Sequence, residues 1–183
     1  MTRLAALALL AAVAGAGACS DVQPPPVAAT ATGADSADQV LFGVRSALAA
    51  GGVRRGELFA DTVFMFDQST RMELLGVRAN FFTSTGELDG TLTSREGTYN
   101  TRTGIMEARG DVVVQSQDGR RLESPELRFL VNQNEIRSDS SFVLTRPGDR
   151  LTGVGFVSDP NLQNVQVFRA TGATGGSVTI PGR

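Results

Sequence analysis

Two pairs of acidic residues are the main candidates for chemistry in this chain. Glu123 with Glu126, and Asp139 with Asp159, have the residue types of a glycosidase acid/base pair or of calcium ligands. The chain has no histidine and a single cysteine, Cys19, so it lacks the usual base of a catalytic triad and the thiolates of a zinc site. Each carboxylate lies at an ordinary polar strand or turn position. We therefore predict no catalytic residue, no cofactor and no metal.

The elements that position these residues are predicted to be β-hairpins, because a short unit recurs along the chain. The unit is an aromatic residue, a turn-forming residue five positions later and an apolar residue two positions beyond it. Glycine and asparagine tolerate the positive φ of a tight turn. The composition, with 21 glycines and no tryptophan, is also typical of many strands and tight turns. The three copies are Phe81, Gly86 and Leu88; Tyr99, Gly104 and Met106; and Phe129, Asn134 and Ile136.

Apolar and polar residues alternate through these strands, which predicts one apolar and one solvated face. A sheet of this kind curls or pairs with a second sheet to bury its apolar face. We predict an all-β fold, an open twisted β-jelly roll built of successive antiparallel hairpins. The predicted inner face includes Leu74, Phe81, Leu88, Tyr99, Met106, Ala108, Val112, Val114, Leu127, Phe129, Ile136, Phe142 and Leu144.

The N-terminal segment is typical of a lipoprotein signal peptide. Residues 4–13 are apolar after Arg3, and small residues lead into Cys19. An ordinary secretory peptide with an unmodified Cys19 is the alternative. Residues 39–50 have the spacing of either a helix or an edge strand. We expect a signal peptide over residues 1–18, a lipidated Cys19 with a disordered, proline-containing tether over 19–38, a β domain over 39–170 and a flexible glycine-rich tail over 171–183.

The last apolar strand is predicted to be an edge at which a partner docks. It carries Val165, Val167 and Phe168, with Arg169 as its only charge. An unguarded edge strand presents unpaired backbone groups that pair with another strand. The net charge is −2 with both signs interspersed, so there is no basic stripe and we expect no nucleic-acid partner.

Four motifs occur in order along the C-terminal part of the chain. They are G-D-V-x-V, L-x-S-x-x-L-x-F, I-x-S-D and L-x-G-x-G-F-x-x-D, at residues 110–114, 122–129, 136–139 and 151–159. Together they resemble the LptC family, the membrane-anchored periplasmic component of the lipopolysaccharide export machine. The resemblance extends over about residues 56–162, and its last motif is the most specific. The earlier motifs also occur in related OstA-type periplasmic bridge proteins.

The resemblance implies an open β-jelly roll that receives lipopolysaccharide from an inner-membrane ABC transporter of the LptBFG type. Acyl chains are then expected in the apolar interior formed by the inner-face residues named above. The lipid is expected to pass to an LptA-type bridge protein by end-to-end strand pairing. The implied location is the periplasmic face of the inner membrane. Many family members keep an uncleaved N-terminal transmembrane helix, whereas this chain has a lipoprotein-type cleavage site and a tether.

Three alternatives remain open from the residues alone. A structural or adaptor lipoprotein with a closed β core has the same periodicity as a lipid groove. Small residues at Gly90, Gly97, Ala108 and Gly110 favour the groove, because they leave space that a packed core would fill. A soluble LptA-like bridge protein would share the fold and ligand but lack a lipidated Cys19. A carbohydrate-active jelly roll would need a carboxylate pair in a cleft.

Overall fold

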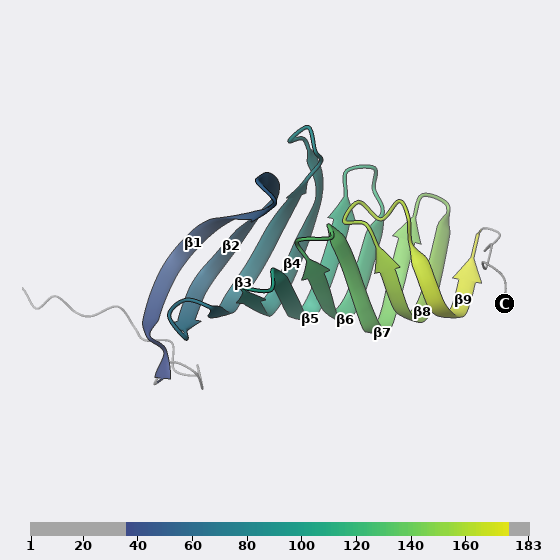
Figure 1. The fold of residues 1–183 in the computed structure, drawn as a ribbon. Helices are drawn as coiled ribbons and strands as arrows, with labels where there is room; N and C mark the ends of the chain where they lie inside the picture. The colour runs from purple at the N-terminus through teal and green to yellow at the C-terminus, as the bar shows by residue number, and fades with distance from the viewer. Residues whose placement is uncertain (1–35, 176–183) are drawn as a thin grey trace, which may run out of the picture. The chain divides into compact units, whose positions relative to one another are not determined.

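The computed structural model describes residues 36–175. Nine antiparallel strands form one sheet in chain order, so β1 and β9 are its two edges (Figure 1). The strands are β1 (Gln39–Ala50), β2 (Val53–Phe66), β3 (Arg71–Phe82), β4 (Leu88–Asn100), β5 (Ile105–Ser116), β6 (Arg121–Leu130), β7 (Glu135–Arg146), β8 (Asp149–Ser158) and β9 (Gln166–Thr174). Residues 39–50 are therefore a strand and not a helix, and the last strand continues past residue 170. The signal peptide, Cys19, residues 20–35 of the tether and residues 176–183 of the tail lie outside the described residues.

Hairpin turns form where the repeating unit predicts them. The turn residues Gly86, Gly104 and Asn134 have φ angles of 87°, 67° and 52°. This left-handed region is the one that glycine and asparagine tolerate best. In two copies of the unit the aromatic and apolar residues face each other across the ladder, as Tyr99 with Met106 and as Phe129 with Ile136.

A break in strand pairing crosses the sheet near the middle of the strands, and we call this line the crease. Inward-facing residues are two positions apart on either side of it but three or four apart across it, as between Leu74 and Val77 or between Ala108 and Val112. Extra residues in a strand bend it and increase its twist. The crease positions are Gly43, Asp61, Gly76, Arg95, Asp111, Pro125, Asp139, Gly155 and Phe168, in order from β1 to β9.

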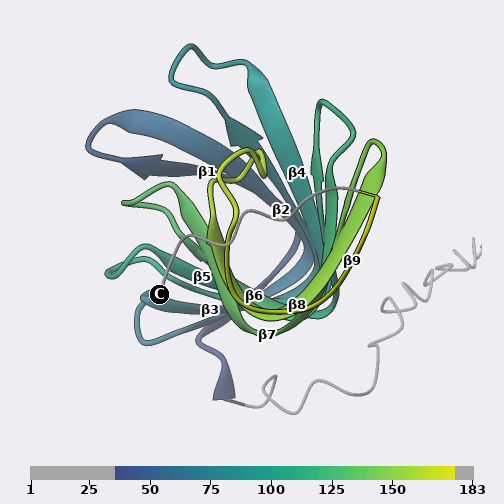
Figure 2. The ribbon, with the colours of Figure 1, turned by 90° about the vertical axis from the view of Figure 1, so that its right-hand side faces the viewer.

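The crease divides the sheet into two limbs. The first limb lies on the side of the turns at 67–70, 101–104 and 131–134, and the second on the side of the turns at 83–87, 117–120 and 147–148. Phe129 of the first limb meets Phe81 of the second with ring centroids 4.7 Å apart. In a flat sheet these rings would lie toward opposite ends of their strands, so their contact requires the sheet to fold along the crease. Figure 2, viewed from the β9 end, shows the strands bending around the interior.

Buried serines satisfy backbone groups that the crease leaves out of the ladders. The Ser124 hydroxyl lies 2.9 Å from the carbonyl oxygen of Glu126 and 3.0 Å from that of Ser141, and donates toward them. The Ser138 hydroxyl accepts the N–H of Ser140 at 3.1 Å. Burying a backbone polar group without a partner is costly, so these short side chains allow the strands to bend inside a packed protein.

Candidate lipid-binding interior

The interior between the limbs contains most of the residues predicted for the inner face. Eleven of the thirteen are at most 3% exposed: Leu74, Phe81, Met106, Ala108, Val112, Val114, Leu127, Phe129, Ile136, Phe142 and Leu144. Tyr99 is half-buried and packs against the same cluster. Burial raises the pKa of its phenol above the usual value.

Leu88 is the exception, and the structure corrects its predicted place on the inner face. Its side chain is 40% exposed. The ladder between β3 and β4 shifts between Phe81 and Phe82, so Leu88 pairs with Phe82 while Phe81 pairs with Gly90. Residues directly opposite each other share a face, so the shift takes Leu88 off the face that contains Phe81. A bulge of one residue is enough to defeat a prediction based on alternation.

The structure adds interior residues that the sequence reading did not assign. Leu58 and Val63 of β2 and Phe156 of β8 are at most 2% exposed, and Phe156 packs edge-on against Phe142 with centroids 5.2 Å apart. Leu162, in the connection between β8 and β9, is 1% exposed. Alternation alone does not assign both residues of β2, because Leu58 and Val63 are five positions apart on opposite sides of the crease at Asp61. Leu162 had no alternation to signal it, because it lies in a loop with no strand periodicity.

The interior side chains pack on one another in a single buried cluster. Three glycines were predicted to leave the empty space of an open groove. In the structure, atoms of neighbouring segments lie close to each of these glycines and occupy that space. A Cβ added at Gly90 would stand 2.9 Å from the carbonyl oxygen of Pro160, and one at Gly97 would stand 2.9 Å from that of Glu107. At Gly110 the space holds the Arg95 side chain, whose Nε would be 2.8 Å away. Those glycines therefore do not support the groove interpretation.

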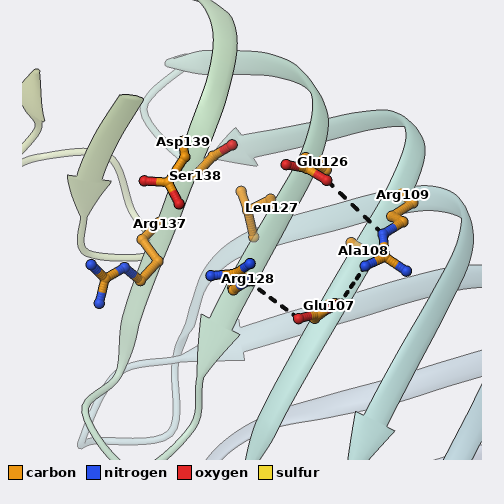
Figure 3. A pocket seen from close by; sticks show the side chains of 9 residues that line it. All are labelled: Glu107, Ala108, Arg109, Glu126, Leu127, Arg128, Arg137, Ser138 and Asp139. Carbon is orange, nitrogen blue, oxygen red and sulfur yellow. Dashed lines mark hydrogen bonds and ion pairs between the residues drawn. The ribbon is translucent and has the colours of Figure 1, made fainter. Parts of the chain in front are cut away.

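The outer face carries the charged residues in ion pairs. In the hollow of Figure 3, Glu107 on β5 pairs with Arg109 at 2.7 Å and with Arg128 of β6 at 3.3 Å. Glu126 accepts a hydrogen bond from the Ser140 hydroxyl at 2.9 Å. Partly exposed pairs of this kind contribute little to stability. This face is the solvated one that the alternation predicts.

Neither predicted acidic pair forms a shared site, although Glu126 and Asp139, one from each pair, both line the hollow of Figure 3. Glu123 pairs with Arg121 at 2.8 Å on the second limb, while Glu126 lies across the crease. Asp139 is at the crease of β7. Asp159 accepts hydrogen bonds within the β8–β9 connection. Within residues 36–175 no group of three or more acidic or cysteine side chains is placed to hold a metal ion.

The sequence and fold match known proteins of lipopolysaccharide assembly. A family model described as "Lipopolysaccharide-assembly, LptC-related" matches residues 5–173. The chain belongs to this LptC-related family. The solved structure of LptH from Pseudomonas aeruginosa, titled "the LptA homologous periplasmic component of the conserved lipopolysaccharide transport device", aligns with a TM-score of 0.50 and 18% identity over 69% of this chain and 88% of that one. This likeness confirms the open β-jelly-roll fold. A search of curated proteins gave no match.

Both edges of the sheet in this LptC-related protein carry exposed aromatic side chains. Phe168 on β9 is 62% exposed, and Phe42 on β1 is 76% exposed. Val165 and Val167, the other residues predicted at the docking edge, are half-buried and pack against the interior. No helix within residues 36–175 is long and apolar enough to cross a membrane.

Proposed function

We propose that this protein is a periplasmic lipopolysaccharide-binding component of lipopolysaccharide export, held at the inner membrane by a lipidated Cys19. The observation that carries the proposal is a continuous apolar interior that extends across the sheet from β1 to β8, in a chain of the LptC-related family. An interior of this shape provides similar surroundings along its whole length. It suits a ligand that moves along the sheet better than one that is held at a single point.

The apolar side chains of the interior suit the acyl chains of a lipid. Acyl chains gain about 0.8 kcal/mol per CH₂ when they leave water for an apolar environment. Because the interior side chains already pack on one another, acyl chains enter only when the two limbs part. The contacts between Phe81 and Phe129 and between Phe142 and Phe156 are then exchanged for contacts with lipid. Apolar contact replaces apolar contact, so the net cost of opening is small.

The two edges of the sheet provide a direction for transfer. We infer that lipid arrives from an inner-membrane ABC transporter of the LptBFG type and leaves at β9 to an LptA-type bridge protein. β9 supports this role because one side of the strand has no partner in the described chain and Phe168 is exposed on it. A partner strand would extend the sheet by backbone hydrogen bonds and cover that ring.

A closed-core adaptor lipoprotein is the second candidate, and the packed interior is the observation that favours it. The two candidates differ in whether lipid ever contacts the interior side chains.

A soluble bridge protein differs instead at Cys19, whose lipidation would be detected as a mass increase of the mature protein. In that case the interior would still bind lipid.

Photocrosslinking from the interior tests the proposal. A photoreactive amino acid is placed at Met106, Phe129 or Phe142, and the protein is combined with vesicles that contain lipopolysaccharide and the transporter. We expect lipid adducts at these positions only when ATP is hydrolysed. The control position is Arg121, which is on the outer face and pairs with Glu123. Absence of adducts at all three interior positions, in folded protein, would establish the adaptor with a closed core.

A further inference from the structure

The connection between β8 and β9 crosses from the first limb to the second, and we call residues 159–165 the strap. It leaves β8 after Ser158, which lies on the first limb, and reaches β4 on the second. There the Asn161 side chain donates a hydrogen bond to Asp89 at 3.1 Å. β4 and β8 are not neighbours in the sheet. In Figure 1 the strap runs back from the β8–β9 end across the front of the sheet toward β4.

The strap packs against the backbone of β4 at Gly90, where a side chain would block the contact. The carbonyl oxygen of Pro160 lies over Gly90, where a Cβ would stand 2.9 Å from that oxygen. Any larger residue at position 90 would push the strap outward. The strap therefore rests on the second limb through one side-chain hydrogen bond and one close backbone contact.

Leu162 is the residue that the strap inserts between the limbs. Its side chain is 1% exposed and belongs to the apolar cluster of the interior. Its φ is +59°, a conformation that a leucine rarely adopts because its Cβ crowds the following carbonyl. Such a conformation persists only where the surroundings hold it, and residues of this kind cluster at clamps and switches.

The strap keeps its own shape through local bonds. The Asp159 carboxylate accepts the N–H of Gln163 at 2.8 Å and the N–H of Asn164 at 3.1 Å. It also accepts the side-chain amide of Asn164 at 2.6 Å. These bonds lie within the strap and do not tie it to the second limb. The strap can therefore lift from β4 as a unit while its internal bonds remain, which is a low-energy form of local opening.

We propose that Leu162 is a plug that occupies an acyl-chain position between the limbs. The strap lifts at the contact between Asn161 and Asp89 when lipid enters. This inference rests on the proposed function, because it assigns a gating residue to the same interior. The apparent dissociation constant for lipid is then the intrinsic constant divided by the fraction of molecules with the strap lifted. A change that keeps the strap on β4 lowers that fraction and weakens lipid binding. A change that removes the Leu162 side chain raises the fraction and strengthens lipid binding.

The test locks and unlocks the strap in the full chain carrying Cys19→Ser, so that introduced cysteines are the only thiols. In the double variant Asp89→Cys, Asn161→Cys, a short bis-methanethiosulfonate reagent joins the two cysteines through disulfide bonds across the gap now bridged by the Asn161–Asp89 hydrogen bond, and reduction releases the link. Binding of fluorescently labelled lipopolysaccharide is measured with the link intact and after its reduction. We expect at least about tenfold weaker binding in the linked form, with recovery on reduction.

Leu162→Gly is the unlocked variant, because glycine accepts the positive φ and removes the plug. We expect about tenfold tighter binding than in the parent chain. Gln163→Ala, which changes an exposed side chain on the same strap, should bind like the parent. Equal affinity of the linked and reduced double variant, or binding by Leu162→Gly that is unchanged or weaker, overturns the plug while the proposed function stands. Failure of the parent chain to bind lipopolysaccharide overturns the proposed function itself, and the plug with it.

Discussion

At the scale of single residues, one buried carboxylate adds a side-chain link between the edge strand β1 and its neighbour β2. The Glu57 side chain on β2 is 10% exposed, and its Oε1 atom pairs with Arg45 of β1 at 2.5 Å and with Arg54 at 2.8 Å. The hydrogen bond from Arg45 is the main reason that the pKa of Glu57 is lowered from its usual value, although burial opposes this shift. A carboxylate with a lowered pKa stabilises the folded state only while it is ionised.

Glu57→Gln should therefore lower the melting temperature at neutral pH. The stabilisation is fully present above the unfolded-state pKa of about 4.3 and is lost as the pH falls through the lower folded-state pKa. The difference between parent and variant is thus expected at pH 7 and should narrow below about pH 4. Thermal unfolding at both pH values measures it. The control is Glu123→Gln, an exposed carboxylate paired with Arg121, which should change little at either pH. Parallel pH curves for the parent and Glu57→Gln would contradict the assignment.

At the scale of elements, the crease contains three glycines that are each covered by a side chain of a neighbouring strand. Asp61 covers Gly76, Arg95 covers Gly110 and Phe168 covers Gly155. All three glycines have positive φ, between 63° and 75°. At these three places one strand bends at a residue without a Cβ, and a side chain of the neighbouring strand fills the gap. This arrangement lets a single sheet enclose its own apolar face.

Gly76→Ala should destabilise the protein by about 2–4 kcal/mol, because it combines an unfavourable φ with a steric clash. A Cβ at this position would lie 2.0 Å from Oδ2 of Asp61. The matched control is Gly119→Ala, where φ is +89° and no atom lies within 4 Å, so only the conformational cost of about 1 kcal/mol applies. Urea unfolding measures both.

A second substitution separates the two causes. Adding Asp61→Ala to Gly76→Ala removes the clash and should recover part of the lost stability, which a double-mutant cycle reports as coupling between the two positions. Equal losses for Gly76→Ala and Gly119→Ala would mean that Asp61 moves aside at no cost.

The hairpins were predictable from the sequence, whereas the crease was not. The turns at Gly86, Gly104 and Asn134 follow from residues that tolerate positive φ between alternating strands. The crease combines glycine, aspartate, arginine, proline and phenylalanine at different strands, so no single residue type marks it. Its trace in the sequence is a slip in the apolar period once per strand, as between Leu74 and Val77. That slip is visible only when neighbouring strands are aligned.

The candidate site was also predictable only in part: most of its buried residues were identified from the sequence, but the packing of the two limbs was not. Alternation identified side chains that are deeply buried, such as Met106 and Phe129. It failed at Leu88, where a bulge changes the face, and at Leu162, which enters the interior from a loop. Alternation also does not distinguish an open groove from a filled interior, because both bury the same positions. That distinction depends on how the two limbs pack on each other, which is set by the crease.

At the scale of the whole β domain, the sheet formed by residues 36–175 has β1 and β9 at its two edges and one interior that lies between them. Each strand pairs only with its neighbours in sequence, so β1 and β9 stand at opposite ends of the sheet. Under the proposed function, lipid moves along the interior while partners bind at the ends. Docking and lipid binding therefore use different side chains and are separable by mutation.

Phe168→Lys should weaken binding to an LptA-type bridge protein by about tenfold, or about 1.4 kcal/mol. The ring is 62% exposed on the edge strand, where a partner strand would bury it, and a lysine there guards the edge. Because the same ring covers Gly155, some loss of thermal stability is expected, so binding is compared at a temperature at which both chains are folded. Lipopolysaccharide binding should then stay close to that of the parent. The matched control is Phe42→Lys, which changes a ring that is 76% exposed at the opposite edge and should leave bridge-protein binding intact. Binding is measured by titration of immobilised protein. A loss in Phe42→Lys with none in Phe168→Lys would reverse the direction of transfer, and no loss in either would remove strand docking at β9 from the mechanism.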